Sequence, residues 1–228
     1  MAVINCRGWH SRRKYFTIWH EIAHLLLGGE QYRIVFRKSN VIKKDPEEIL
    51  VDKIAAELAF YAPIFLPVFK DEIQKESKLT FGLVDRIRDK VCSDSSRHAA
   101  LLACLKNCQA PVYFLSAKKG YKKKELEELK SDQEKLFPEM EKIPKIKLRI
   151  NQAIPSEGMN KLKVRFHKNM EVPSTSVIFS AFENSAIESF GKDSLSSWRT
   201  SSGPIGYRDM EIETLKISDE EIWAIVRF

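Results

Sequence analysis

The chain has 228 residues, 43% hydrophobic and 30% charged, a composition that excludes a largely disordered protein. No uncharged apolar run approaches the roughly 18 residues of a membrane span, and the first residues lack the apolar core of a signal peptide. We therefore expect a cytosolic protein without a membrane partner, folded as one large domain or, preferably, as two compact units.

The formal net charge of +7 is compatible with a polyanionic partner, because Lys and Arg supply the sequence-independent part of nucleic-acid binding. The basic residues are dispersed, however, and the densest run, at 118–124, passes directly into the acidic segment 125–128. Opposite charges at helical spacing pair with one another. The pattern predicts a solvated helix start rather than a nucleic-acid patch.

The N-terminal part predicts a short strand followed by a helix. An apolar stretch at 2–5 is typical of a strand, and a helix is predicted from about Ser11 to Leu27, where Gly28-Gly29 ends it. Apolar and histidine side chains recur along this helix at spacings of three and four residues, namely Phe16, His20, Ala23, His24 and Leu27.

A second helix is predicted to begin at Asp45-Pro46 and to run to about Tyr61. An Asp cap, a Pro at the first position and acidic residues in the first turn are typical of a helix N-terminus, and Glu47 and Glu48 lie in that turn.

Further helices are predicted near 79–90 and 94–106, the latter capped by Asp94 or Ser95, and a charged helix at about 122–136. A β-like run at 112–115 lies between them. Among the four scattered cysteines, Cys104 and Cys108 lie four residues apart in a helical pattern, which predicts reduced, buried thiols.

From Pro144 the sequence becomes β-rich. Strands are predicted at 161–166, 175–182, 210–217 and 222–228, and the Ser- and Gly-rich segment 194–206 is predicted to be a mobile loop. We therefore expect an α+β protein with a boundary near residue 140. Residues 1–140 would form a mostly helical domain with a short sheet, and residues 141–228 a smaller β-rich region for recognition or regulation.

The chemistry of the chain is concentrated in His20-Glu21-Ile22-Ala23-His24, a His-Glu-x-x-His motif on the first helix. Four residues make slightly more than one helical turn, so both imidazoles lie on one face and can bind one tetrahedral Zn²⁺. Glu21 lies beside that face, where it can take a proton from a zinc-bound water and give it to the leaving amine. The bland alternative is a pair of ordinary histidines on an amphipathic helix.

A catalytic zinc site needs a third protein ligand, and the acidic start of the second helix offers Glu47 and Glu48. We choose Glu48, because Asp52 lies one turn beyond it and can orient a ligating histidine through its second ring nitrogen. Glu57 is a weaker candidate, since it lies in an apolar run. Alternatively, Glu47 and Glu48 only complement the helix dipole.

A donor to the transition-state oxyanion would complete such a site. His167, Tyr113 and Tyr207 are the candidates, although a structural role is the simpler expectation for each of them.

The residues around the motif resemble the ImmA/IrrE family of metallo-endopeptidases. That family has an Arg-rich lead, Phe-Thr and HELGH with a Leu run, and then E-x-x-A-N-x-F-A-A-E-L-L-M-P. Here the first half reads RRKYFTIWHEIAHLLL at 12–27 and the second EILVDKIAAEL at 48–58. With SSRHAALLACL at 95–105 and the following APV, the likeness covers about residues 2–116.

The resemblance implies a gluzincin-like fold in which His20, His24 and Glu48 bind zinc and Glu21 is the acid/base. It also implies site-specific cleavage of a helix-turn-helix repressor in a stress-response or mobile-element switch. Asp52 stands where the family usually has Asn, and Pro63 comes two residues later than the family's Pro. The family normally has a further segment before the strand at 2–5, so we expect an N-terminus that is either shortened or incompletely called.

Three functional hypotheses remain open. The first is a cytosolic zinc endopeptidase whose partner is a DNA-binding repressor. The second is a non-proteolytic, antitoxin-like regulator with structural zinc, but a structural site has no use for a general base such as Glu21. The third is direct DNA binding through the helices between Leu79 and Lys106, which the dispersed charge does not favour.

Overall fold

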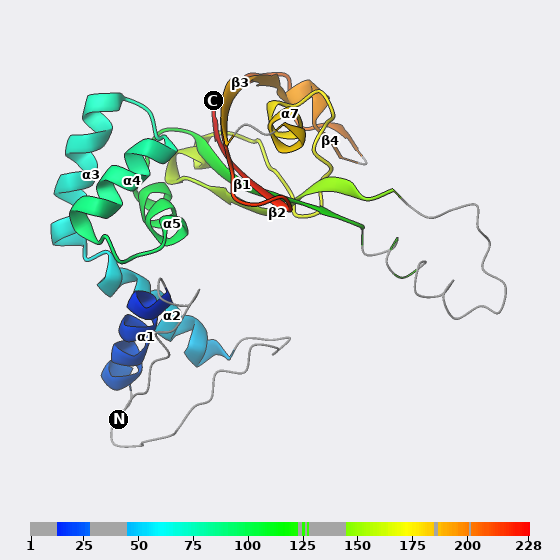
Figure 1. Ribbon diagram of the computed structural model, residues 1–228. Coiled ribbons are helices and arrows are strands. Elements are labelled where there is room, and N and C mark those ends of the chain that lie inside the picture. Colours follow the sequence, from blue (N-terminus) through cyan, green and yellow to red (C-terminus); the bar gives the residue numbers. More distant parts are fainter. Residues whose placement is uncertain are drawn as a thin grey trace, which may run out of the picture. The chain divides into compact units, whose positions relative to one another are not determined.

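The computed structural model of the chain describes residues 13–27, 45–122, 125, 127, 145–184, 187–200 and 202–228 (Figure 1). These residues form two compact units. The first contains the described residues up to Lys78 together with Gly82–Cys104, and the second contains Leu79–Phe81 and the described residues from Leu105 onwards. The predicted α+β class is confirmed, because helices build the first unit and an antiparallel sheet builds most of the second.

Helices account for the regular structure of the first unit: α1 (Arg13–Leu27), α2 (Pro46–Ala59), α3 (Ala62–Glu76), α4 (Phe81–Val91) and α5 (Arg97–Asn107). The first residue of α4 and the last three of α5 belong to the second unit. Four of these helices were predicted, with ends that differ by a few residues. The cap of α5 was predicted wrongly, since Ala99 N donates to Ser96 Oγ at 3.1 Å.

Helix α2 begins as its sequence predicts. The Asp45 side chain accepts a hydrogen bond from Glu47 N at 3.0 Å, and Pro46 occupies the first position, where its missing N–H has no cost. Helices α1 and α2 pack through fully buried small or β-branched side chains, Ala23, Val51 and Ala55. Because Ala23 has only a methyl group, the two helix backbones can approach closely at the turn that carries the histidines.

Helix α3 was not predicted, because Pro63 and Pro67 interrupt its sequence. Pro63 lies in the first turn, where proline is tolerated, and Pro67 lies inside the helix and removes one backbone donor. Burial compensates for that loss. Phe65 and Phe69 are nearly inaccessible and stack with ring centroids 5.7 Å apart.

The second unit contains a five-stranded antiparallel sheet of β1 (Val112–Gly120), β2 (Lys147–Pro155), β3 (Glu188–Ser194), β6 (Asp209–Lys216) and β7 (Glu221–Arg227). The strand order is β2-β1-β7-β6-β3. The first six residues of β1 are all buried, in keeping with its inner position. The short elements are η3 (Glu157–Lys161), α7 (Val177–Glu183), η4 (Leu195–Ser197) and the hairpin of β4 (Arg199–Thr200) and β5 (Gly203–Pro204).

The core of the second unit lies between the sheet and α7. Trp198 is fully buried, and the Phe166 ring meets both Trp198 and Tyr113 edge to face, at centroid distances of 5.1 and 5.2 Å. Ile178 and Phe182 of α7 belong to the same cluster. These aromatic contacts anchor the loops between the strands onto the sheet.

The strands predicted at 210–217 and 222–228 are confirmed as β6 and β7, but two others were wrong. Most of the strand predicted at 175–182 lies in α7, and Ser176 caps that helix by accepting from Ile178 N at 3.1 Å. Residues 161–166 alternate in burial but follow the short helix η3 without forming a strand. The predicted mobile loop at 194–206 is also wrong in part, because Leu195 and Trp198 are fully buried.

The compact units do not divide at the predicted residue 140, which lies outside the described residues. They divide near residue 105, because β1 is an inner strand that pairs with both β2 and β7. The predicted strand at 2–5, the glycines at 28–29 and most of the helix at 122–136 also lie outside the described residues. Cys92, Cys104 and Cys108 are buried free thiols, as expected for the two that were predicted. In the described ranges no helix is both long and apolar enough to cross a membrane.

Candidate metal centre

Helix α1 presents His20 and His24 on one face. Their rings meet edge to face with centroids 4.8 Å apart, and the two Nε2 atoms are 3.2 Å apart. His20 is only 4% exposed because it lies on the face of α1 that packs against α2. The side chain of His24, one turn later, is 25% exposed. The pair therefore has one buried member and one that solvent can reach.

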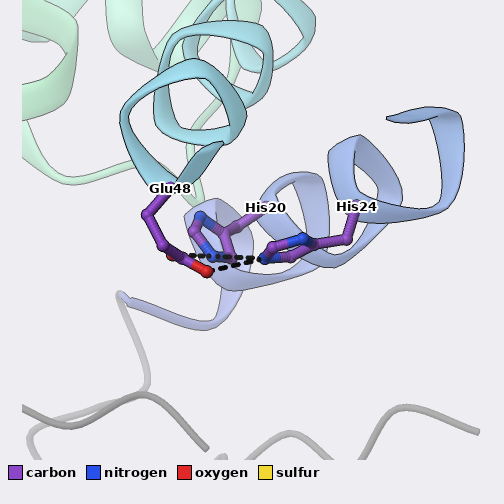
Figure 2. A group of neighbouring side chains, drawn as sticks. All are labelled: His20, His24 and Glu48. Atoms are coloured by element: carbon purple, nitrogen blue, oxygen red, sulfur yellow. Dashed lines mark hydrogen bonds and ion pairs between the residues drawn. The ribbon is translucent and has the colours of Figure 1, made fainter. Parts of the chain in front are cut away.

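Helix α2 brings Glu48 to both imidazoles (Figure 2). Its Oε2 lies 3.4 Å from His20 Nε2 and its Oε1 lies 3.3 Å from His24 Nε2. Figure 2 shows the carboxylate of Glu48 and the two rings pointing toward one another from two helices. The donor atoms of His20, His24 and Glu48 all lie within 4.8 Å of one another, so this group could hold a metal ion.

Asp52 holds His20 from the other side of the ring. Its Oδ1 lies 3.0 Å from His20 Nδ1, and it is one helical turn beyond Glu48 on α2. When the carboxylate accepts from Nδ1–H, the lone pair of a neutral His20 ring is on Nε2, which faces Glu48 and His24. Asp52 thus selects the tautomer and the ring orientation that a metal ligand needs.

The spacing of the two ring nitrogens fits a tetrahedral ion. With ligand distances of about 2.0–2.2 Å, neighbouring ligand atoms of such an ion lie about 3.3–3.6 Å apart. The two Nε2 atoms are 3.2 Å apart, and Glu48 reaches them with different oxygens, Oε2 at 3.4 Å from His20 and Oε1 at 3.3 Å from His24. With one atom taken from each residue, the three ligand atoms lie within 4.8 Å of one another.

Glu21 lies on α1 between the two histidines in sequence and is partly exposed. Within the described part of the chain its carboxylate has no hydrogen bond or ion pair. One residue corresponds to about 100° around a helix, so Glu21 lies beside the histidine face rather than on it. Its carboxylate is therefore available to exchange a proton with a molecule bound at the group.

The other predicted carboxylates lie outside the group. Glu47 and Glu57 are exposed on α2, although Glu57 lies in an apolar run of the sequence. Helical phase explains the difference, because Val51 and Ala55 define the face of α2 that packs against α1. Glu48 and Asp52 lie on one side of that face, whereas Glu47 lies on its other side and Glu57 points away from it.

The three predicted oxyanion donors belong to the second unit, whereas the group of His20, His24 and Glu48 belongs to the first. Tyr113 is buried there and donates its hydroxyl to the Val164 carbonyl at 3.2 Å, and burial raises its pKa above the usual value. His167 is exposed, and Tyr207 is 83% exposed. Tyr113 therefore has a structural role in the core of the second unit.

Sequence reasoning missed the contribution of Tyr15 to the support of this centre. Its hydroxyl donates to the Ala59 carbonyl at the end of α2 at 3.2 Å, and burial, first of all, raises its pKa to about 12. The phenol thus stays protonated and ties α1 to α2 five residues before His20. The only sequence signal was its position one turn before Trp19, on a face that also contains Phe16.

Comparison with models of known protein families finds no match to this chain, and comparison with functionally characterised proteins finds none either.

Proposed function

We propose that the chain is a zinc-dependent metallo-endopeptidase, with His20, His24 and Glu48 as the metal ligands and Glu21 as the general base and acid. The observation that supports this most strongly is the convergence of the three donor groups from α1 and α2. Two imidazoles and one carboxylate, with a further position left for water or substrate, form a donor set typical of catalytic zinc. Nitrogen ligands make zinc a better choice than Mg²⁺ or Ca²⁺, which prefer oxygen.

Bound zinc would polarise a peptide carbonyl and lower the pKa of a bound water to about 7. Glu21 would take the proton of the attacking water and deliver it to the amine that leaves, because it is next to His20 in sequence and its carboxylate has no other described partner. Asp52 would keep His20 in the ligating tautomer throughout. His24 and Glu48, each about one quarter exposed, mark the side from which a peptide can approach.

The substrate proposal rests on the resemblance of residues 12–27 and 48–58 to the ImmA/IrrE family. By that resemblance the fold around α1 and α2 is gluzincin-like, and the protein acts in the cytoplasm on one helix-turn-helix repressor. The residues after 140 would supply a second recognition surface. Selective cleavage also fits a cytoplasmic location, because a protease of broad specificity there would digest the proteins of its own cell.

A non-proteolytic zinc-containing regulator is the alternative. It predicts the same metal content but gives Glu21 no task. Direct DNA binding has less support, because the basic side chains of α4 are ion-paired: Arg86 with Glu72 and Glu76, Arg88 with Asp85 and Asp89, and Lys90 with Glu72.

The decisive experiment compares the wild-type chain with Glu21→Gln. We expect both to contain one zinc per chain by elemental analysis. Wild type should cleave the repressor encoded nearest to the gene, and a chelator should abolish this cleavage. Glu21→Gln should cleave it roughly 10²- to 10⁴-fold more slowly, because an amide cannot exchange the proton.

Glu47→Gln is the matched control, since it removes an exposed carboxylate outside the group and should keep both metal and activity. Cleavage by Glu21→Gln at the wild-type rate contradicts the mechanism. Zinc binding with no cleavage of the repressor by wild type, under conditions where the repressor is intact and bound, favours the regulator instead. Rapid digestion of casein by wild type would contradict selectivity.

A further inference from the structure

Strand β3 is at one end of the sheet and pairs with β6 on one side (Figure 1). Its odd-numbered residues turn their backbone toward β6: the Ile187 carbonyl accepts from Lys216 N at 2.8 Å, and Leu195 N donates to the Arg208 carbonyl at 2.9 Å. In an antiparallel ladder the direction of the backbone groups alternates from residue to residue. The N–H and C=O groups of Glu188, Phe190 and Lys192 therefore point away from β6, to the outer edge.

The opposite edge of the sheet is strand β2, and unlike β3 it is hydrogen-bonded to a further segment of the chain. Along β2, Ile150 N donates to the Met170 carbonyl at 2.9 Å, Asn169 N to the Ile150 carbonyl at 2.7 Å, and Val172 N to the Leu148 carbonyl at 2.9 Å. The chain segment 169–172 thus satisfies the outer backbone groups at the start of β2, at Leu148 and Ile150. The outward backbone groups of Glu188, Phe190 and Lys192 have no hydrogen bond to another described residue.

The side chains of the same three residues share one exposed face of β3. Phe190 is 66% exposed, and Glu188 and Lys192 are exposed on either side of it. Neither charged side chain has an ion pair with any described residue. The alternate residues face α7 instead: Asp193 Oδ1 accepts from Val177 N at 3.0 Å, and a Cβ on Gly191 would come within 2.6 Å of a Val177 methyl.

We propose that two copies of this chain pair through β3, antiparallel and about a two-fold axis at Phe190, to form one continuous sheet. Phe190 of each copy would then face Phe190 of the other. Each Glu188 would lie directly opposite Lys192 of the second copy, on the same face. All three outward residues would form the hydrogen-bonded type of pair, so that their backbone donors and acceptors are satisfied.

The charges of Glu188 and Lys192 determine both which strand can pair with β3 and in which register it pairs. Glu188 and Lys192 are placed symmetrically about Phe190, so a second copy of the strand complements the first. An axis at Glu188 or at Lys192 would put like charges opposite each other, which destabilises cross-strand pairs. The two-fold register at Phe190 places both charges of each chain against their opposites. The proposal does not depend on the metal centre or on proteolysis.

Charge reversal tests this register in the full-length chain. We expect wild type to associate to a dimer in analytical ultracentrifugation over a dilution series. Glu188→Lys alone or Lys192→Glu alone should weaken dimerisation about tenfold, because each replaces two opposite-charge pairs by two like-charge pairs. The double reversal Glu188→Lys/Lys192→Glu should restore it.

An equimolar mixture of the two single variants should also dimerise, because one chain then has two lysines opposite the two glutamates of the other. Glu220→Lys reverses an exposed charge outside β3 and is the control, with no expected effect. A monomeric wild type at every concentration overturns the proposal. A dimer that both single reversals leave unchanged, or two single variants that do not associate when mixed, overturns it equally.

Proline substitution tests the outward backbone groups. Phe190→Pro removes an N–H that the isolated chain does not use in the ladder with β6, and proline is tolerated at such positions on edge strands. We expect this variant to be a folded monomer by circular dichroism and ultracentrifugation. Ser189→Pro removes an N–H that points toward β6, so it should lower the melting temperature instead. A Phe190→Pro chain that is folded and still dimeric overturns the proposal.

Discussion

Different kinds of contact stabilise the α1–α2 helix pair of the first unit and the interior of the second unit. Around the metal-binding group, the apolar cluster between α1 and α2 has three fully buried members, and polar contacts position His20 and Glu48. The second unit has a large apolar core between its sheet and α7, with Trp198 among its fully buried side chains. The comparison teaches that the geometry of the site depends on a few polar contacts, while most of the apolar burial lies elsewhere.

The largest effect on stability is expected from Trp198→Ala in the second unit. Truncation of a fully buried Trp removes its contact with Phe166 and leaves a cavity, which typically costs about 3–5 kcal/mol. Denaturant unfolding should show this loss while elemental analysis finds unchanged zinc. The control Tyr207→Ala removes an aromatic residue that is 83% exposed and should change stability by less than about 0.5 kcal/mol. Loss of zinc from the Trp198→Ala chain would show that zinc binding in the first unit depends on the core of the second.

The next effect concerns the metal, and it distinguishes two adjacent residues. Glu48→Ala should lower zinc affinity roughly 10²- to 10³-fold, the share of one ligand in a binding free energy of about 10–16 kcal/mol. Glu47→Ala should leave zinc affinity nearly unchanged, because Glu47 lies outside the group. Competition with a chromogenic chelator measures both. The reverse order of affinities would move the ligand by one position and leave the orientation of His20 by Asp52 unexplained.

The smallest expected effect is a pH dependence in the first unit. Hydrogen bonds from Lys90, Lys75 and Arg86 lower the pKa of the Glu72 carboxyl from 4.5 to about 2. A lowered pKa in the folded state stabilises the fold above the unfolded pKa, and this stabilisation is lost as the pH falls from about 4.5 to about 2. The difference in melting temperature between wild type and Glu72→Gln should therefore shrink over that range.

Glu220→Gln is the control for this titration, since it removes an exposed carboxylate from the second unit. It should leave the melting temperature of the first unit unchanged. A difference between wild type and Glu72→Gln that stays constant from pH 4.5 to 2 would mean that Glu72 is not held by these cations.

The sequence alone determined the local features of the first unit. The spacing of His20 and His24 fixes two imidazoles on one face of a helix, and the Asp45 cap with Pro46 fixes where the next helix begins. Both are consequences of local geometry, so no knowledge of distant contacts was needed. Glu48 and Asp52 are also four residues apart, which places them on one face of α2. The structure brings Glu48 to both histidines and Asp52 to His20. Their roles toward a metal remain predictions.

Tertiary structure decided what local sequence could not. Helix α3 forms despite Pro67 because Phe65 and Phe69 are buried, and most of the segment 175–182 lies in α7 because Ser176 caps a helix whose apolar face packs on the sheet. The units divide near residue 105 because β1 pairs with β7, which lies more than a hundred residues later in the chain. Sheet pairing and burial join residues far apart in sequence, so the free energy that selects these structures appears only when the chain has folded.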